Sequence, residues 1–503
     1  MAQILVNNLT FGYEGSFDLI FDNVSFSIDT DWKLGLIGRN GKGKSTFLNL
    51  LMGKYKYQGT IQTSTVFDYF PYIINDEQMK QSAAEFIEDL KIGCESWRVM
   101  CELNLMGVDT EILYRPFETL SHGERTKVLL AVLFSGENDF LLIDEPTNHL
   151  DVESRVTIRE YLAKKKGFIL VSHDRELLDG CIDHVLVLNR QSIEVQSGNF
   201  SSWWENKEKK DSFARAENKK HLKEIEKLGK AAATTAEWAA KGGSKKIGYD
   251  SIKEPDRPAN ARTYISSKTK KMQSKVKQIE KRINREIEEK EDLLVDIEDV
   301  VDLKIMPLIH HKEVLVNVRD FSVTYKGSET PVFENLTFQI KRGERVCLRG
   351  ANGCGKSTVI KAILKTLNED AVQTGMLEIA SGLVISYVNQ DTSGLHGTIR
   401  EYCKENGIEE SLLCAILHQL DFDRVQFVKK MEDFSEGQKK KVLLATSLIT
   451  PAHLYIWDEP FNYIDVFSRM QIEKLIDTND FTMLFVEHDS RFCDKIATRT
   501  VNM

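Results

Sequence analysis

The chain has 503 residues, of which 42% are hydrophobic and 28% charged, and its formal net charge is −9. This length leaves room for two or three domains with full cores, and the composition excludes a disordered chain. No apolar run approaches the ~18 residues that a membrane-spanning helix needs, and we expect no signal peptide. The eight cysteines form no CxxC pair, so we expect reduced thiols in a cytoplasmic protein.

The first motif that carries chemistry lies at residues 38–46, where GRNGKGKST fits the pattern G-x-x-x-x-G-K-[ST]. An apolar strand (LGLIG) precedes this loop and an apolar helix (FLNLL) follows it. Glycines let backbone N–H groups close around phosphates. We therefore expect Lys44 to reach the β- and γ-phosphates of a nucleotide and Ser45 to bind Mg²⁺. The alternative is a glycine turn without a ligand, which the strand and helix on either side disfavour.

An acidic pair ends a later apolar strand, LLIDEP. Asp144 is placed to hold the water shell of a Mg²⁺ ion. Glu145 follows directly, and a carboxylate beside the γ-phosphate can orient the attacking water as a general base. The alternative is an acidic residue that caps a helix after the strand.

Residues 201–305 form a basic segment in an otherwise acidic chain. From Ser201 to Lys290 there are 24 Lys and Arg against 14 Asp and Glu, a net charge of +10, so the rest of the chain carries −19. This separation of charge suggests a polyanionic partner that the basic segment contacts. A solvated helical face or a plain linker would have the same composition, and charge alone does not decide between them.

We predict that this segment folds as two antiparallel helices with a tip near residues 242–262. A helix from about residue 202 to 241 would be ~60 Å long at ~1.5 Å per residue. From Met272 onward, apolar residues recur every three or four positions, as on one stripe of a second helix. Residues that disfavour helices separate the two, namely Gly242, Gly243, Gly248, Pro255 and Pro258. The tip residues expected to contact RNA are Lys245, Lys246, Tyr249, Lys253, Arg257 and Arg262.

The C-terminal part of the chain repeats the landmarks of the N-terminal part in the same order. The offset stays between 312 and 315 residues for the pairs Tyr13 and Tyr325, Lys44 and Lys356, Ser121 and Ser435, Asp144 and Asp458, and His173 and His488. A set of this kind indicates a duplicated domain. We predict domains at residues 1–200 and 306–503, joined by the linker at 201–305.

Together these landmarks resemble the ABC ATPases: an aromatic A-loop, a Walker A loop, the signatures LSHGE and FSEGQ, a Walker B strand and a switch histidine. The resemblance implies an α/β fold with two tandem ABC-type P-loop domains that bind ATP and Mg²⁺. The implied ATP-binding residues are Tyr13, Gly38, Asn40, Gly41, Gly43, Lys44, Ser45, Thr46, Ser121 and Gly123, and their counterparts Tyr325, Gly350, Asn352, Gly353, Gly355, Lys356, Ser357, Thr358, Ser435 and Gly437.

The resemblance also assigns the chemistry. The implied catalytic residues are Glu145, Glu459, His173 and His488, and the implied metal ligands are Ser45, Asp144, Ser357, Gln390 and Asp458. In this family two domains enclose two ATP molecules head to tail, so Ser435 and Gly437 would close on the Lys44 site. Ser121 and Gly123 would close on the Lys356 site.

Two positions depart from the family pattern. The third signature residue, where glycine is usual, is His122 in one half and Glu436 in the other. The Q-loop glutamine is present as Gln390, whereas Tyr72 occupies the matching position of the first half. The second departure puts the rate of hydrolysis at the Lys44 site in question, but not ATP binding there.

Two linked ATPase halves without a membrane domain resemble the ABC-F translation factors. The segments GLIGRNGKGKST, RPFETLSHGERTKVLL, LIDEPTNHLD and WDEPFNYIDVF resemble the Lsa-type antibiotic-resistance proteins. These proteins protect bacterial ribosomes from lincosamides, pleuromutilins and streptogramin A. The resemblance implies a 70S ribosome partner, with the linker in the tRNA exit site near 23S rRNA and P-site tRNA. It also implies release by ATP hydrolysis and a monomer off the ribosome.

Three alternatives remain at this point. A housekeeping ABC-F factor would have the same fold and partner but would act on stalled ribosomes without drug. A transporter ATPase would need a membrane partner, and a DNA-repair ATPase would need a longer coiled coil or a zinc-binding insertion. Sedimentation with ribosomes or with membranes, with hydrolysis blocked, separates these classes.

Overall fold

The computed structural model describes residues 2–13, 19–136, 139–148, 150–188, 193–244, 307–327, 330–367, 370–420, 422 and 426–503, with a few helical positions between 274 and 285. Contacts divide the chain into two units, Met1–Trp203 with Val301–Met503, and Trp204–Val300. Within the described ranges, no helix has both the length and the apolar character needed to cross a bilayer. The predicted domain boundaries stay predictions.

The first half contains two β-sheets. The smaller is antiparallel, in the order β2 (Phe21–Asp29), β1 (Gln3–Phe11), β4 (Gln58–Gln62). The larger has the order β5 (Val66–Phe70), β6 (Asp139–Asp144), β7 (Phe168–Val171), β3 (Lys33–Ile37), β8 (His184–Leu188), β9 (Ile193–Ser197). All of its neighbours run parallel except β8 and β9. The continuous apolar run FILV of β7 is buried throughout, as expected for a strand covered on both faces.

Seven α-helices of the first half are described: α1 (Lys44–Leu51), α2 (Asp76–Lys80), α3 (Ala83–Leu90), α4 (Ser96–Leu105), α5 (His122–Phe134), α6 (Val152–Ala163) and α7 (Arg175–Cys181). Two 3₁₀ turns, Thr110–Tyr114 and Phe117–Thr119, precede α5. Phe47 and Leu48 of α1 are fully buried in one cluster with side chains of both sheets. This packing fixes the loop before α1 over the ends of the parallel strands.

The second half repeats this plan. Its antiparallel sheet has the order β11 (Phe333–Lys341), β10 (Val314–Tyr325), β13 (Ala371–Ile379). Its parallel sheet has the order β14 (Ile385–Val388), β15 (Leu454–Asp458), β16 (Met483–Val486), β12 (Arg345–Arg349), β17 (Arg499–Asn502). The helices are α10 (Lys356–Ile363), α11 (Ile399–Asn406), α12 (Glu410–Gln419), α13 (Glu436–Ile449), α14 (Val466–Thr478) and α15 (Ser490–Ile496), with 3₁₀ turns at Gln426–Val428 and Met431–Asp433. Both halves therefore have the predicted α/β fold.

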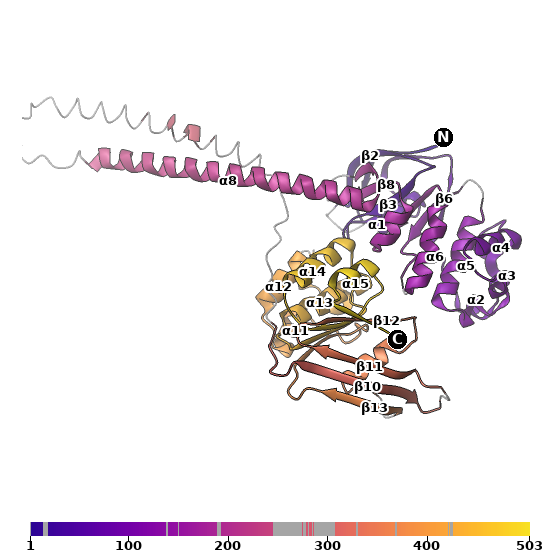
Figure 1. The fold of residues 1–503 in the computed structure, drawn as a ribbon. Coiled ribbons are helices and arrows are strands. Elements are labelled where there is room, and N and C mark those ends of the chain that lie inside the picture. The colour runs from indigo at the N-terminus through magenta and orange to yellow at the C-terminus, as the bar shows by residue number, and fades with distance from the viewer. Residues whose placement is uncertain are drawn as a thin grey trace, which may run out of the picture. The chain divides into compact units, whose positions relative to one another are not determined.

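One long helix, α8 (Phe200–Ser244), begins at the end of the first half (Figure 1). Phe200 and Trp203 are buried, whereas Phe213 and Leu222 farther along are 66% and 55% exposed. The helix continues across Gly242 and Gly243, where we expected it to have ended. Glycine costs only about 1 kcal/mol relative to alanine in a helix, so two glycines near a terminus do not end it. Most residues of the predicted second helix lie outside the described part of the chain.

Candidate nucleotide-binding sites

Each phosphate-binding loop ends a parallel strand and begins a helix, as predicted. The residue before α1 is Gly43, with φ of 91°, and the residue before α10 is Gly355, with φ of 97°. An added Cβ would lie 2.5 Å from Cγ2 of Ile20 in the first loop and 2.7 Å from Cδ1 of Phe333 in the second. Both the backbone conformation and the close approach therefore require glycine at these positions.

The two loop lysines are buried, and their ammonium groups point back into the loops. Nζ of Lys44 donates to the carbonyl oxygens of Gly38 at 2.7 Å and Arg39 at 3.2 Å. Nζ of Lys356 donates to those of Gly350 at 2.9 Å and Ala351 at 2.8 Å. Burial lowers the pKa of Lys44, although nearby carboxylates oppose this shift. Both ammonium groups are placed where a phosphate in the loop would meet them.

The Walker B aspartates lie beside the loop serines. Oδ2 of Asp144 accepts from the hydroxyls of Ser45 and Tyr69, both at 3.1 Å. Asp458 is 2% exposed, and among the described residues its Oδ1 has no hydrogen-bond donor. A buried oxygen without a donor suits a hydrated Mg²⁺ ion, because hard cations prefer oxygen ligands. The residues present therefore fit a Mg²⁺ ion at Asp458, with Ser357 bonded to the same carboxylate.

The two candidate general bases share a strained backbone but differ in their surroundings. Glu145 and Glu459 have φ of 52° and 46°, in the left-handed region. Oε1 of Glu145 lies 3.3 Å from Nε2 of His173, and Oε1 of Glu459 lies 3.5 Å from Nε2 of His488. Oε2 of Glu459 also accepts from the side-chain amides of Gln390 and Asn462, both at 2.7 Å.

These surroundings move the pKa values of the two carboxyl groups in opposite directions. Burial, and then the charge of Asp144, raise the pKa of Glu145 to about 8. Burial also opposes ionisation of Glu459, but the hydrogen bonds from His488 and Asn462 hold its pKa below the ordinary value. Near neutral pH, Glu459 is therefore ionised, whereas most of the Glu145 population carries a proton.

The Q-loop position of the first half differs from its counterpart in contacts as well as in residue type. The hydroxyl of Tyr72 donates to Oδ2 of Asp68 at 2.7 Å, so it is bound away from the Walker B carboxylates. Tyr69 contacts Asp144 instead. Sequence reasoning missed Tyr69, although its place one residue before the end of β5 matches Tyr387 in the repeat.

The predicted adenine-stacking residue of the first half is accessible. Tyr13 is 44% exposed as a residue, and its ring packs edge-on against Phe11 and Tyr55, with centroids 5.2 and 5.8 Å away. Its hydroxyl lies 2.8 Å from Oγ1 of Thr46. Tyr325 ends β10 at the matching place. The ring of Tyr13 therefore lies beside the first phosphate-binding loop.

The second half's signature meets the first half's phosphate-binding loop. Nδ2 of Asn40 donates to the carbonyl of Tyr463 at 2.9 Å. A Cβ added to Gly437 would lie 2.5 Å from that same carbonyl and 3.3 Å from Nδ2 of Asn40. Ser435 caps α13, and Ser121 caps α5, each through a capping box. Gly437 therefore lies on the Lys44 loop, whereas the nucleotide roles of the two serines stay predictions.

A buried ion pair joins the two halves near the same site. The guanidinium of Arg175 in α7 binds both carboxylate oxygens of Glu473 in α14, one of them at 3.1 Å. The two side chains are 8% and 3% exposed. Nη1 of Arg469, also in α14, donates to the carbonyl of His173 at 3.1 Å. Sequence reasoning missed this pair, because its members lie 298 residues apart and belong to no motif.

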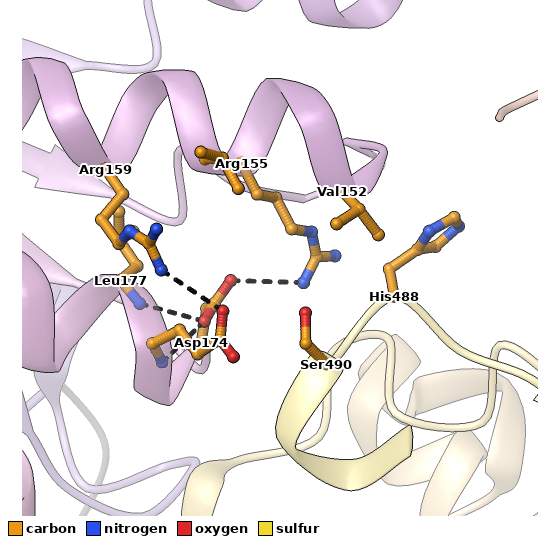
Figure 2. Close-up of a pocket in the computed structure, with 9 residues that line it drawn as sticks. Val152, Arg155, Arg159, Asp174, Leu177, His488 and Ser490 are labelled. Atoms are coloured by element: carbon orange, nitrogen blue, oxygen red, sulfur yellow. Dashed lines mark hydrogen bonds and ion pairs between the residues drawn. The ribbon is translucent and has the colours of Figure 1, made fainter. Parts of the chain in front are cut away.

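The repeat-related position has no such pair (Figure 2). With the offsets of the repeat, Ser490 corresponds to Arg175 and Arg159 to Glu473. In the described structure Ser490 and Arg159 line one small pocket, and Arg159 binds Glu176 of its own half at 3.5 Å. A serine facing an arginine cannot form an ion pair, so the two edges of the contact between the halves differ.

The tip residues predicted to contact RNA, Lys245, Lys246, Tyr249, Lys253, Arg257 and Arg262, lie outside the described residues. The chain does contain exposed cations on the described part of α8, among them Lys219, Lys220 and Lys223. The surface of the linker is thus described mainly along its first helix, with a few further positions between 274 and 285.

Comparison with known proteins identifies the family. The family described as "ABC transporter" matches residues 21–148 and 333–462, slightly more than half of the chain. The chain is 29% identical over 491 residues to the ribosome protection protein VmlR of Bacillus subtilis, covering 96% of this chain and 84% of that protein. It is 24% identical to the probable ATP-binding protein YbiT of Escherichia coli O157:H7, covering 96% and 93%.

Among solved structures, the archaeal ribosome recycling factor aABCE1, in complex with the stalk protein aP1, has a similar fold. The TM-score is 0.61 at 18% identity, and the match covers 98% of this chain and 87% of that one. This likeness shows the fold, and the two family matches show that both halves are ATPase domains. The chain therefore belongs to the ABC family of ATPases and, within it, to the ABC-F proteins.

Proposed function

We propose that this chain is an ATP-dependent factor that binds the bacterial ribosome and protects it from antibiotics of the peptidyl-transferase centre. The observation that carries the proposal is the match to VmlR, named a ribosome protection protein, over 96% of this chain and 84% of that protein. The net charge of +10 between Ser201 and Lys290 suits a surface of RNA phosphates. The drug classes we propose are lincosamides, pleuromutilins and streptogramin A.

In the proposed mechanism, ATP draws the two halves together and hydrolysis releases the protein. Lys44 and Lys356 bind the β- and γ-phosphates, and the signature glycines of the opposite halves close each site. Mg²⁺, held through Ser45 and Asp144 or through Ser357, Asp458 and Gln390, would neutralise phosphate charge. Glu145 and Glu459 orient the attacking water, while His173 and His488 contact the γ-phosphate.

The linker is the proposed effector. We propose that its two helices enter the tRNA exit site and place the tip near 23S rRNA and P-site tRNA. Lysine and arginine at the tip would pair with phosphates, and Tyr249 would stack on an unpaired base, worth roughly 1–3 kcal/mol. This role separates the tip from ATP chemistry, and a loop-shortening experiment tests that separation.

Replacing residues 245–258 by a short Gly-Ser turn is expected to abolish drug resistance while ATP hydrolysis and folding stay near normal. Susceptibility of a sensitive host to lincosamides and pleuromutilins gives the readout. As a matched control, Lys219, Lys220 and Lys223 on α8 are changed to alanine. This control should weaken ribosome binding and flatten its dependence on salt, because each phosphate contact releases counterions. Full protection by the shortened protein would refute the role of the tip.

A second candidate is a housekeeping ABC-F factor that acts on stalled ribosomes without drug. It is favoured by 26% identity to the ATP-binding protein Uup of Caulobacter vibrioides, covering 96% of this chain and 74% of that one, and by the match to YbiT. The susceptibility assay separates the two candidates. A chain that sediments with ribosomes but leaves susceptibility unchanged would support the housekeeping function.

The two ATP sites are expected to hydrolyse at different rates. Glu459→Gln, which leaves only the Lys44 site active, should reduce steady-state hydrolysis at pH 7 more than Glu145→Gln does. The base must be deprotonated, and with a pKa of about 8 only about one-tenth of Glu145 is deprotonated at pH 7. Residual activity of the Glu459→Gln variant should therefore rise roughly tenfold from pH 7 to pH 9.

The Glu145→Gln variant provides the control for this pH profile. Its activity depends on Glu459, whose pKa is lowered, so the same range of pH should leave its rate nearly constant. Equal losses in the two variants at pH 7, or parallel pH profiles, would contradict the proposed inequality.

A further inference from the structure

Lys440 is a buried cation in the second half that none of the ATP-binding motifs includes. It lies in the first turns of α13, and the whole residue is 1% exposed. Its Nζ donates to the carbonyl of Asn389 at 2.8 Å and to that of Glu459 at 3.4 Å. One ammonium group thereby joins the residue before Gln390 to the proposed general base.

These two carbonyls lie where neighbouring parallel strands end. β14 ends at Val388 and β15 at Asp458. Val388 is paired with Trp457, the residue directly before Asp458. Beyond the strands, Nε2 of Gln390 donates to Oε2 of Glu459 at 2.7 Å. The ammonium therefore spans the backbones of the same two segments whose side chains meet in the site.

The charged groups around Lys440 are acidic. Burial lowers the pKa of the Lys440 ammonium, and the carboxylates of Asp458, Glu487, Glu459 and Glu436 oppose that shift. The negative charge of these carboxylates compensates the buried cation. Without the ammonium, the repulsion among the carboxylates would no longer be offset.

The first half has a different residue at the corresponding place. With the offset of 314 that relates the two signatures, Thr126 corresponds to Lys440. The hydroxyl of Thr126 donates to the carbonyl of His122 in its own helix, at 2.9 Å. An ammonium at this position of the helix is thus a feature of the second half, as is the Q-loop glutamine next to which it binds.

We propose that Lys440 is a positioning residue for hydrolysis at the Lys356 site, holding Gln390 and Glu459 in register through the carbonyls of Asn389 and Glu459. This inference rests on the proposed role of Glu459 as the general base. Lys440 itself contacts neither nucleotide nor water in this assignment. Its effect should therefore fall on the chemical step and not on ATP binding.

The test measures ATP hydrolysis in Glu145→Gln protein, where only the Lys356 site is active. Lys440→Met removes both the charge and the hydrogen bonds, and Lys440→Gln keeps donor groups without the charge. We expect kcat to fall roughly tenfold or more with Lys440→Met, since small misplacements of catalytic groups can cost about 100-fold. KM for ATP should change less than about twofold, because the substitutions leave the contacts that bind ATP in the ground state unchanged.

A comparison of the two substitutions distinguishes positioning from simple loss of stability. Among variants that are folded by thermal unfolding, Lys440→Gln should retain more of kcat than Lys440→Met, because its amide can still donate to a backbone carbonyl. Lys474→Met, on the exposed side of α14, is the control and should leave kcat unchanged. Where Lys440→Met does not fold, Lys440→Gln decides.

An unchanged kcat in a folded Lys440 variant would overturn the proposal, as would a loss confined to KM. The same substitutions are also made in the otherwise unaltered chain. An inactive Glu145→Gln parent would refute the proposed role of Glu459 as a general base. The comparison in the unaltered chain would then still show whether Lys440 affects hydrolysis. The assay contains neither ribosomes nor drug, so a failure of ribosome protection cannot produce the same result.

Discussion

Replacing both Glu145 and Glu459 by glutamine is expected to give a chain that binds ATP but hydrolyses it roughly 10²–10⁴-fold more slowly. Glutamine keeps the shape of the side chain and part of its hydrogen bonding, but it cannot accept a proton from the attacking water. The closed state should then persist, and the protein should stay on the ribosome. Steady-state phosphate release and sedimentation with ribosomes in ATP measure the two effects.

Two controls make this expectation specific. The single substitutions should each leave one working site, so neither should trap the protein as fully as the pair. Changing Lys44 and Lys356 to alanine should instead weaken ATP binding and prevent retention. Rapid ATP turnover by the double glutamine variant would remove both glutamates from the role of general base.

Removing Glu473 is expected to destabilise the chain by about 3–5 kcal/mol, because Arg175 would keep a buried charge without its main partner. The guanidinium binds both oxygens of Glu473, and Asp489 lies farther away at 3.6 Å. Glu473→Ala should lower the urea concentration at half-unfolding. Changing Arg175 and Glu473 together to methionine should restore much of the loss, since an apolar pair leaves no buried charge.

The matched control is Glu176→Ala, which breaks the ion pair that Arg159, the repeat counterpart of Glu473, forms within the first half. Arg159 and Glu176 are about one-third exposed, at 33% and 31%, and lie 3.5 Å apart, so this change should cost less than about 1 kcal/mol. Equal losses of stability in the two alanine variants would contradict the expectation that the more buried ion pair costs more to break. A methionine pair as unstable as Glu473→Ala would show that the loss comes from packing and not from unpaired charge.

The features predicted from the sequence are those that lie in contiguous stretches. The loop at residues 38–46 contains its glycines, its lysine and the start of its helix, so its geometry follows from neighbouring residues. The α/β fold is implied by the family resemblance that these stretches carry, and the first linker helix is predicted up to the glycines that follow it in the sequence. The end of α8 was missed, because the preference of glycine for other conformations is small beside the cooperativity of a long helix.

The rest depends on residues that meet only after folding. Tyr69 reaches Asp144 because β5 and β6 are paired, and Lys440 reaches Asn389 across 51 residues of sequence. The opposite pKa shifts of Glu145 and Glu459 likewise depend on burial and on neighbours from other elements. A sequence motif gives the type of each side chain, but it does not show which residues from distant parts of the chain will contact that side chain after folding.

The unequal charges at the contact between the halves also determine which pairs of halves can associate without repulsion. Two copies of the first half, arranged in the same way, would bring Arg175 against Arg159, and two copies of the second would bring Ser490 against Glu473. Like charges repel in the first case and the pair is missing in the second. Only a first half beside a second half aligns Arg175 with Glu473. This edge thus favours the unlike partner, which disfavours assembly of identical halves from two separate chains.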